Sequence, residues 1–414
     1  STNDTWDEGT ITWSNQPGYN TAASDSRTVT QAHGYRWVEW DVTAFVAAQN
    51  SADRTVSLVV KPETEGADPY EVFAFDAKEY VGAPIVLLGS RAPRLRVEYS
   101  GGQWPQDNNI TILHTNDAHS RLTPHEMDIP GHDDVPEFEA VGGAAFLAAK
   151  MIALKQANPH SLVLDAGDIS EGNPIGDLRV NGGMIDFYNA LDAKLKTLGD
   201  GRGIDAVVVG NHDVRAGQMP DNMLGANFPF ISMNIFWTDS NTQSQTPGTT
   251  VFAPHVIVTV NGRKIGILGY TTDESAYLGD GTQGEIEVKK CVWANGGADE
   301  INIKDSVANL RDNLGCDIVI LLSHIGQSRV VCGEDALLAD FGDVEPPEVV
   351  ISGHWHSITD QAWMPSQLNN KTLVTEAASY MQYIGQLDIT GNGKYVAAQK
   401  HVIRNADIDP DPDI

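Results

Sequence analysis

The sequence has few cysteines, few basic residues and no long apolar run. Its 414 residues include three cysteines, which is too few for a disulfide framework. No apolar run approaches the roughly 20 residues that cross a bilayer, so we expect no membrane span. Lys and Arg number 27 against 56 Asp and Glu, which gives a formal net charge of -29. This balance argues against duplex nucleic acid as a partner, because binding to its backbone requires a basic surface.

A leader segment and a serine nucleophile motif are also missing. Ser1 opens a polar stretch, so we expect a chain that begins after processing or a cytosolic one. The acidity favours a secreted, extracellular or cell-surface location, with the periplasm as an alternative. No Gly-x-Ser-x-Gly motif occurs. Cys316 is expected to be a core thiol, whereas a Cys291–Cys332 disulfide is left open by the spacing.

Residues 1–100 differ in pattern from the rest of the chain. Short alternating or apolar runs recur between polar turns that contain Gly or Pro, which predicts a small antiparallel β-sandwich. We expect its tryptophans mainly in the core, with stacking on sugar rings as the alternative. These are Trp6, Trp13, Trp37 and Trp40.

Three segments of this region carry a resemblance. Trp40–Val46 and Phe75–Glu79, followed by Pro84–Leu88, resemble the C-terminal half of DNRLRE-type, carbohydrate-binding-like modules of secreted bacterial proteins. The resemblance implies contact with carbohydrate or with a cell surface. It also implies that the first strands of the module are missing. We therefore expect an incomplete sandwich with open edges, which could self-assemble by strand exchange.

Strands alternate with helical stretches from Ile110 onward, which predicts an α/β layered sandwich of mixed sheets flanked by helices over residues 108–404. The Gly- and Pro-containing residues 101–107 are the expected linker. Residues 405–414 form an acidic tail or linker, with a calcium loop as the less favoured alternative. We expect helices at 146–156, 184–198, 303–314 and 336–341. We expect hairpins at Asn261-Gly262 and Gly391–Gly393.

Five apolar runs each end in a cluster of Asp, His or Asn. Runs rich in Val and Ile predict strands that are buried on both faces, and ligands gather at the carboxyl ends of such strands. The side chains that follow the runs are Asp117, His119, Asp168, Asn211, His212, His324, His354 and His356. We therefore expect a metal site at one edge of a sheet.

The donor types of this cluster indicate which metals it could hold. Carboxylate, imidazole and amide groups without thiolate suit Zn, Mn, Fe or Co. The donors are too many for one ion, so we expect two divalent metal ions that share Asp168. If the chain is extended, Asp117 and His119 point to one side, and so do His354 and His356. Two ions about 3.5–4 Å apart can hold a bridging hydroxide that attacks a phosphoryl group in line.

These residues, in this order, resemble the five sequence blocks of calcineurin-like metallophosphoesterases. His114–Ser120 and Leu164–Asp168 are similar to the secreted 5′-nucleotidase branch, which includes UDP-sugar hydrolases and 2′,3′-cyclic nucleotide phosphodiesterases. The resemblance implies one metal held by Asp117, His119, Asp168 and His356, and a second held by Asp168, Asn211, His324 and His354. It implies that His212 is the catalytic imidazole, with Asn211 and Asp213 beside it in the catalytic group.

The chain departs from that branch near His212 and at its C-terminus. The branch has an acid three positions after the histidine, where this chain has Arg215, so the orientation of His212 stays open. The branch's C-terminal domain, which sandwiches the base, does not follow Ile414. We expect substrate contacts from Asn116, Asn173 and Trp355, and packing beside the site is the alternative for Trp355.

We therefore expect binuclear metal-dependent hydrolysis of a small phosphate ester or nucleotide by a 5′-nucleotidase-like phosphomonoesterase. A cyclic-nucleotide phosphodiesterase and a nucleotide-sugar hydrolase are the alternatives within enzymes. An extracellular structural, polymer-forming or adhesive protein is the alternative of another class. His114 is expected to pack behind the site. The remaining histidines are expected to be surface or loop residues: His33, His125, His132, His160, His255 and His401.

Overall fold

The computed structural model describes most of the chain from residue 109 onward. The described ranges are 109–130, 136–174, 182–215, 223–241, 244–273, 284–292, 300–326, 345–357, 364–365 and 372–413. The chain divides between Gly102 and Gln103, and every described residue belongs to the second unit. The predicted sandwich, the helix at 336–341 and Cys332 fall on residues outside these ranges. Cys291, with which Cys332 could pair, lies within them and is buried. The domain boundaries stay predictions.

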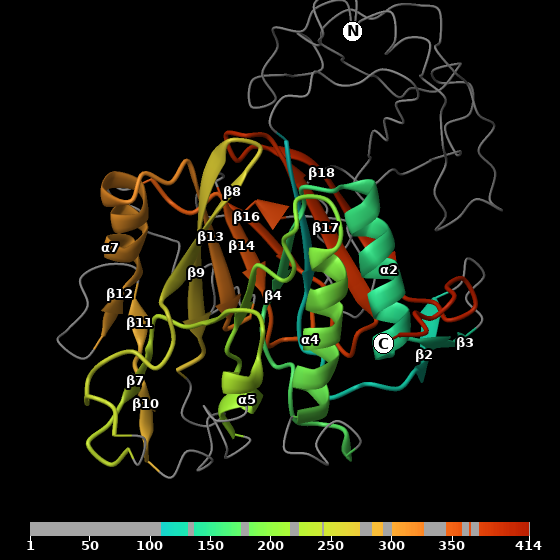
Figure 1. Cartoon of the computed structure of the whole chain (residues 1–414), viewed down its shortest axis with the longest axis horizontal. Helices are drawn as coiled ribbons and strands as arrows, with labels where there is room; N and C mark the ends of the chain where they lie inside the picture. The colour runs from blue at the N-terminus through green and yellow to red at the C-terminus, as the bar shows by residue number, and fades with distance from the viewer. Residues whose placement is uncertain are drawn as a thin grey trace, which may run out of the picture. The chain divides into compact units, whose positions relative to one another are not determined.

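Two six-stranded sheets form the centre of the described unit (Figure 1). The first has the order β18-β17-β1-β4-β5-β6. Its strands are β1 Ile110–Thr115, β4 Leu162–Asp165, β5 Ala206–Val208, β6 Phe230–Ile231, β17 Tyr383–Ile389 and β18 Tyr395–Val402. The second has the order β15-β16-β14-β13-β9-β8. Its strands are β8 His255–Val260, β9 Arg263–Thr271, β13 Ile318–His324, β14 Val349–Ser352, β15 Met364–Pro365 and β16 Leu373–Glu376.

Shorter elements complete the described fold. Three two-stranded pairs are β2 His125–Pro130 with β3 Pro136–Val141, β7 Ile235–Trp237 with β10 Ile286–Val288, and β11 Cys291–Val292 with β12 Ile301–Asn302. The helices are α2 Ala144–Ala157, α4 Gly182–Lys196, α5 Asn211–Arg215, α7 Ile303–Ala308, the 3-10 turn η2 Met223–Gly225 and the π-helix η3 Asn309–Asn313.

The inner strands of each large sheet are buried on both faces, and the strand patterns explain how. Alternate residues such as Ile112 of β1 and Ile320 of β13 meet in one apolar cluster between the two sheets. The intervening residues of the first sheet, such as Leu113, pack against α2 and α4. Those of the second sheet, such as Val319, pack against α7 and η3. The result is an α/β/β/α sandwich, with α2 and α4 on one side and α7 on the other (Figure 1).

The sheets are mixed, as the sequence predicts. The pairs β1–β4, β4–β5 and β5–β6 are parallel, and so are β9–β13, β13–β14 and β14–β16. The two predicted hairpins are confirmed as the antiparallel pairs β8–β9 and β17–β18. Asn261 and Gly262 have φ values of 51° and 76°, as a two-residue hairpin turn requires.

The expectation of a single sheet edge is wrong. The runs before Asp117, Asp168 and Asn211 belong to the first sheet, whereas those before His324 and His354 belong to the second. Burial of both faces of a strand does not show whether helices or a second sheet cover a given face. Here the inner strands have helices on one face and the other sheet on the opposite face. The strand ends therefore meet across the junction of two sheets.

Of the four predicted helices, two are confirmed, one needs a correction, and the one at 336–341 lies outside the described residues. The helices at 146–156 and 184–198 correspond to α2 and α4. The stretch 303–314 starts as α7 but continues as the π-helix η3. Cys316 is buried in the cluster under η3, which confirms it as a core thiol.

Several predicted loop residues lie in strands, and the C-terminal residues pack on the domain. His125, His255 and His401 belong to β2, β8 and β18 and are half-buried.

The Nζ atom of Lys194 in α4 lies 2.6 Å from an Asp413 carboxylate oxygen, and the Asp411 N–H donates to Ala145 O at 3.1 Å. Within the described ranges, none of the helices has the length and apolar character needed to cross a membrane.

Candidate metal centre

Five of the seven predicted metal ligands have positive φ angles in turns just past the strand ends. Their φ angles are 51° at Asp117, 47° at His119, 53° at Asp168, 85° at His354 and 53° at His356. The expectation that the Asp117–His119 and His354–His356 pairs are extended is therefore wrong, because β1 and β14 end at Thr115 and Ser352. The paired side chains converge through these turns. Such backbone costs roughly 1–3 kcal/mol per residue and concentrates at functional sites.

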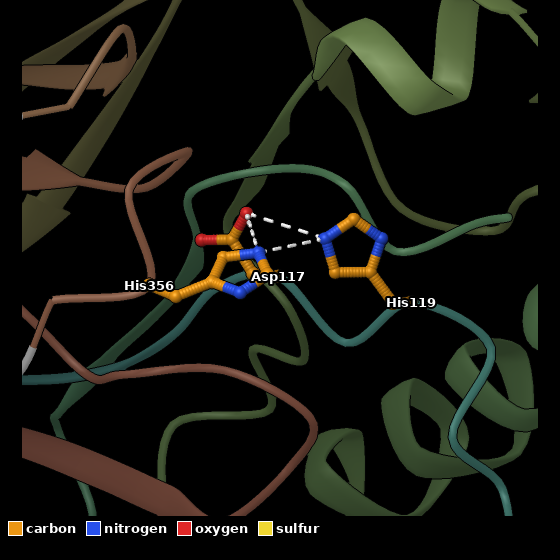
Figure 2. Close-up of side chains that lie close together, drawn as sticks. All are labelled: Asp117, His119 and His356. Atoms are coloured by element: carbon orange, nitrogen blue, oxygen red, sulfur yellow. Dashed lines mark hydrogen bonds and ion pairs between the residues drawn. The ribbon is translucent and has the colours of Figure 1, made fainter. Parts of the chain in front are cut away.

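Asp117, His119 and His356 form the first group of converging donors. Figure 2 shows their side chains pointing toward one another. The Nε2 atoms of His119 and His356 lie 2.9 Å apart. Asp117 Oδ1 lies 3.7 Å from His119 Nε2 and 3.5 Å from His356 Nε2. A carboxylate oxygen and two ring nitrogens at this spacing can surround one cation.

Asp168, His324 and His354 form the second group. His324 Nε2 lies 3.0 Å from Asp168 Oδ2, and His354 Nδ1 lies 2.9 Å from Asn211 Oδ1. Asn211, which follows β5, thus brings its amide oxygen to this group.

The two groups adjoin through Asp168. Its Oδ2 atom lies 3.0 Å from His324 Nε2 in the second group and 3.8 Å from His119 Nε2 in the first. Asp117 Oδ1 in turn lies 4.0 Å from His324 Nε2. A carboxylate with a neighbour in each group can bridge two cations.

The hydrogen bonds of the histidines fit metal ligation. Ala166 O lies 2.6 Å from His324 Nδ1, and Glu171 O lies 2.9 Å from His119 Nδ1. A carbonyl can only accept, so both Nδ1 atoms carry a proton, and each ring in its neutral form would offer the Nε2 lone pair to a cation. His324 Nε2 is buried and lies 3.0 Å from Asp168 Oδ2. This buried nitrogen matches the requirement for a bound cation.

The carboxylates of the site are held in the charged form. Burial alone would raise the pKa of Asp117, but the nearby imidazoles of His119 and His356 and the charge of His324 outweigh burial and lower it. The same balance, dominated by His324, lowers the pKa of Asp168. Conversely, Asp168 and Asp117 overcome burial and raise the pKa of His324 to about 10. The site thus attracts positive charge.

Glycine is required on three sides of the donors. A Cβ atom on Gly167 would lie 2.8 Å from Val208 O, and one on Gly353 would lie 2.6 Å from Ala166 O. A Cβ atom on Gly210 would overlap Asp168 Oδ1 and Asp168 N. These glycines directly precede Asp168, Asn211 and His354, so close backbone approach is what lets the strand ends meet.

Asp213 and Asn116 are buried behind the donors. Asp213 is 1% exposed, and its carboxylate accepts the backbone N–H groups of Asp168, Ser170 and Gly210. Asn116 is 3% exposed, and its side-chain amide donates to Asp117 Oδ2 at 2.7 Å. Both residues support the site from beneath, and their predicted catalytic and substrate roles stay predictions.

The site opens on one side. Asp117, Asp168, Asn211 and His324 are buried. Side-chain exposure rises to 29% for His212, 32% for His356 and 36% for Glu171, and Trp355 is 54% exposed. These four residues are therefore the solvent-exposed part of the site.

Trp355 is fixed although it is exposed. Its Nε1–H donates to Ile325 O at 3.1 Å. Its indole lies on Gly326, where an added Cβ would overlap the ring. Asn173, the third predicted substrate contact, lies half-buried in the loop after β4. Both substrate contacts stay predictions.

Two neighbours of the site were missed by the sequence reasoning. Glu171 contacts His212, as described below. Tyr380 packs its ring edge-on against His356 at a centroid distance of 5.1 Å, and its N–H donates to Asp117 O at 2.7 Å. Tyr380 has a positive φ of 57°. Tyrosine rarely adopts this conformation, so the sequence offers no signal for the turn that places its ring here.

Comparison with known proteins follows the division of the chain. The family model for calcineurin-like phosphoesterases matches residues 110–357, and the model for carbohydrate-binding module family 96 matches residues 1–88. The 5′-nucleotidase of Bos taurus is 30% identical over 349 residues, covering 78% of this chain and 55% of that protein. The chain spans about half the length of the curated relatives it matches.

Two solved structures share the fold. A 5′-nucleotidase precursor from Thermus thermophilus aligns with a TM-score of 0.55 and 23% identity, covering 73% of this chain and 56% of that one. The sulfate thiohydrolase SoxB from Thermus thermophilus, in complex with glycerol, aligns with a TM-score of 0.56 and 18% identity, covering 76% and 60%. The two proteins are named for different activities, so the shared fold alone does not fix the substrate.

Proposed function

Because the chain belongs to the calcineurin-like phosphoesterase family through residues 110–357, we propose that it is a hydrolase of phosphate monoesters. It would use two divalent metal ions and act as a 5′-nucleotidase-like enzyme. The observation that carries the proposal is the convergence of two donor groups that adjoin at Asp168. The relatives that carry the name 5′-nucleotidase support the substrate class.

The donor sets follow from the distances. Asp117, His119 and His356 would hold one ion, and His324, His354 and Asn211 would hold the other, with Asp168 between them. When bound, such ions polarise the phosphoryl oxygens and lower the pKa of a water molecule. Zn, Mn, Fe and Co all suit these nitrogen and oxygen donors.

The protein's own groups contribute position and a proton. The backbone N–H of His212 donates to Asp168 Oδ1 at 2.8 Å, which fixes the start of α5 against the bridging carboxylate. The His212 ring stands edge-on to the His119 ring at 4.8 Å, on the open side of the site. An imidazole in this place can stabilise charge on the phosphoryl group and protonate the leaving oxygen.

We propose that Trp355 contacts the leaving group. An exposed indole that is held at its Nε1 edge offers an apolar face without losing side-chain freedom on binding. Such a face suits a planar group, which a nucleoside monophosphate has and glycerol phosphate lacks. Phosphodiesters and nucleotide sugars are the alternative substrates of the same centre.

The test is a substrate panel with metal control. We expect turnover of p-nitrophenyl phosphate and of nucleoside 5′-monophosphates that is lost in EDTA and regained with Mn²⁺ or Zn²⁺. Trp355→Ala should raise KM for the nucleotide more than for glycerol phosphate, with Tyr395→Ala, a substitution of another exposed aromatic, as the matched control. Faster turnover of cyclic nucleotides or nucleotide sugars would replace the monoester assignment. Absence of turnover with every metal would refute the proposed enzymatic function.

The N-terminal region suggests where the enzyme works. The match of residues 1–88 to a carbohydrate-binding module family supports the proposal that this region contacts a polysaccharide outside the cytoplasm. Retention of the full chain on an insoluble polysaccharide, with phosphatase activity in the retained fraction, is the expected result. If the chain instead formed regular polymers without turnover, the structural alternative would be supported.

A further inference from the structure

His212 needs a partner that its own helix does not provide. In a helix, residues three and four positions apart are neighbours, and the residue three positions after His212 is Arg215. Arginine cannot accept a proton from the imidazole. A carboxylate that orients His212 must therefore come from another part of the chain.

Glu171 supplies this carboxylate from the loop after β4. Its Oε2 atom lies 3.1 Å from His212 Nδ1. The two ring nitrogens point in different directions, so an Nδ1 engaged by Glu171 leaves Nε2 for the substrate. A carboxylate beside Nδ1 accepts the Nδ1 proton and so favours the Nδ1–H tautomer of the ring.

The backbone of Glu171 is committed to the same site. Its carbonyl accepts from His119 Nδ1 at 2.9 Å, so one residue contacts both a proposed metal ligand and the proposed catalytic imidazole. This double contact uses a left-handed backbone, with φ of 55° at Glu171 and 138° at Gly172. A Cβ atom on Gly172 would lie 3.1 Å from His119 Cβ, so the loop fits closely under His119.

The Asp213 side chain of α5 also joins the helix to the backbone of the loop. The Asp213 carboxylate, one residue after His212, accepts from the N–H groups of Asp168 and Ser170, both at 3.0 Å. These bonds fix the loop that carries Glu171 relative to the helix that carries His212. The contact between the two side chains is therefore built into the fold.

We propose that Glu171 is the positioning residue of His212, holding Nδ1 so that Nε2 faces the leaving oxygen; this rests on the proposed phosphomonoesterase function. As the ester P–O bond breaks, its electron pair passes to the leaving oxygen, which takes the proton from Nε2. The oxygen of water forms the new P–O bond and releases a proton to solvent, from which His212 is protonated again. Glu171 holds the ring so that its proton donor stays in place beside the leaving oxygen.

The kinetic test compares leaving groups. Glu171→Ala should lower kcat for a nucleoside 5′-monophosphate by about 10- to 100-fold. The loss for p-nitrophenyl phosphate should be several-fold smaller, because p-nitrophenolate leaves without full protonation. KM and metal content should stay close to wild type, and Glu171→Asp should recover part of kcat. In a His212→Ala background, Glu171→Ala should have no further effect.

Charge and folding are controlled separately. Asp312→Asn removes one negative charge at an exposed position of η3 and should leave both rates unchanged. Equal losses for the two leaving groups, together with loss of metal, would instead assign Glu171 a structural role through His119. Unchanged kinetics in Glu171→Ala would also overturn the proposal.

A measurement without turnover separates this proposal from the proposed function. In ¹⁵N-histidine-labelled, zinc-loaded protein, the neutral form of His212 should be the Nδ1–H tautomer, whose Nε2 can take up the proton that the reaction uses. The His212 signals are identified by their absence in His212→Ala. Glu171→Ala should shift the neutral ring toward the Nε2–H tautomer. If the tautomer shifts in Glu171→Ala but the protein has no phosphatase activity, the role of Glu171 in orienting His212 is supported and only the proposed reaction is rejected. An unchanged tautomer would reject the role of Glu171 whatever the activity.

Discussion

Single histidines in this domain are buried in two different ways. His324 is buried among carboxylates, which raise its pKa to about 10 in spite of burial. His114, in the middle of the first sheet, is buried without a carboxylate, and burial lowers its pKa to about 3. Its Nε2 lies 3.3 Å from Thr375 Oγ1. The same residue type therefore serves as a candidate metal ligand in one place and as neutral core packing in the other.

His114 should make the domain sensitive to acid. Its folded-state pKa of about 3 lies below the ordinary 6.5, so the unfolded chain binds more protons between these values. Its stabilising contribution is complete above pH 6.5 and is lost as pH falls toward 3, by up to about 1.4 kcal/mol per pH unit. We expect the urea midpoint to fall less between pH 7 and 4.5 in His114→Gln than in wild type, measured in EDTA.

His160→Gln provides the control for this pH dependence. The His160 side chain is 60% exposed, so its removal should leave the acid sensitivity of the wild type in place. A parallel fall of the urea midpoint in His114→Gln and wild type would contradict the assignment of the acid sensitivity to His114.

At the scale of elements, the join between β5 and α5 determines the position of two donors. Gly210 separates the strand from the helix, and a Cβ atom there would overlap Asp168 Oδ1 and Asp168 N. Asp168 and the Asn211–His212 pair must therefore move apart if residue 210 carries a side chain. A short helix placed by a close backbone contact is sensitive to a single methyl group.

Gly210→Ala should abolish most activity without unfolding the domain. A displacement of about 1 Å can cost about 100-fold in rate, and we expect a loss of that order in kcat/KM together with weaker metal binding by calorimetry. Gly225→Ala is the matched control, because the atom nearest to a Cβ added at Gly225 is Ile185 Cγ2, at 3.8 Å. Activity within twofold of wild type in Gly210→Ala would show that the close approach is dispensable.

At the scale of the whole molecule, the candidate metal centre joins the two sheets. Asp117, Asp168 and Asn211 follow strands of the first sheet, whereas His324 and His354 belong to the end of the second. Ions held by donors from both sheets would act as cross-links. Ligands that bind only the folded state stabilise it by mass action.

Metal removal should therefore lower thermal stability as well as activity. At metal concentrations about 100 times Kd, the expected stabilisation is about 2.7 kcal/mol, visible as a higher unfolding temperature by calorimetry. Asp168→Ala, which removes the shared carboxylate, should abolish the metal-dependent shift. An unfolding temperature that does not respond to EDTA, Mn²⁺ or Zn²⁺ would mean that no ion links the sheets.

The sequence predicts which side chains cluster at the candidate site because their signals are local. A Val- and Ile-rich run that ends in Asp or His can be recognised without knowing its neighbours, and each of the five runs ends beside the same site. The Glu171–His212 contact joins residues that are 41 positions apart. No residue pattern in the loop after β4 distinguishes Glu171 from any other exposed acid.

By itself, the sequence determined the strands, the mixed α/β class and the chemical identity of the donors, because each of these depends on residue types within a few positions. Only the tertiary structure decided that the donors meet across two sheets, through left-handed turns rather than extended pairs. It also decided that a glutamate from another loop contacts His212. The physical reason is that these features arise from close packing between segments distant along the chain, where glycines and the returning backbone set the distances.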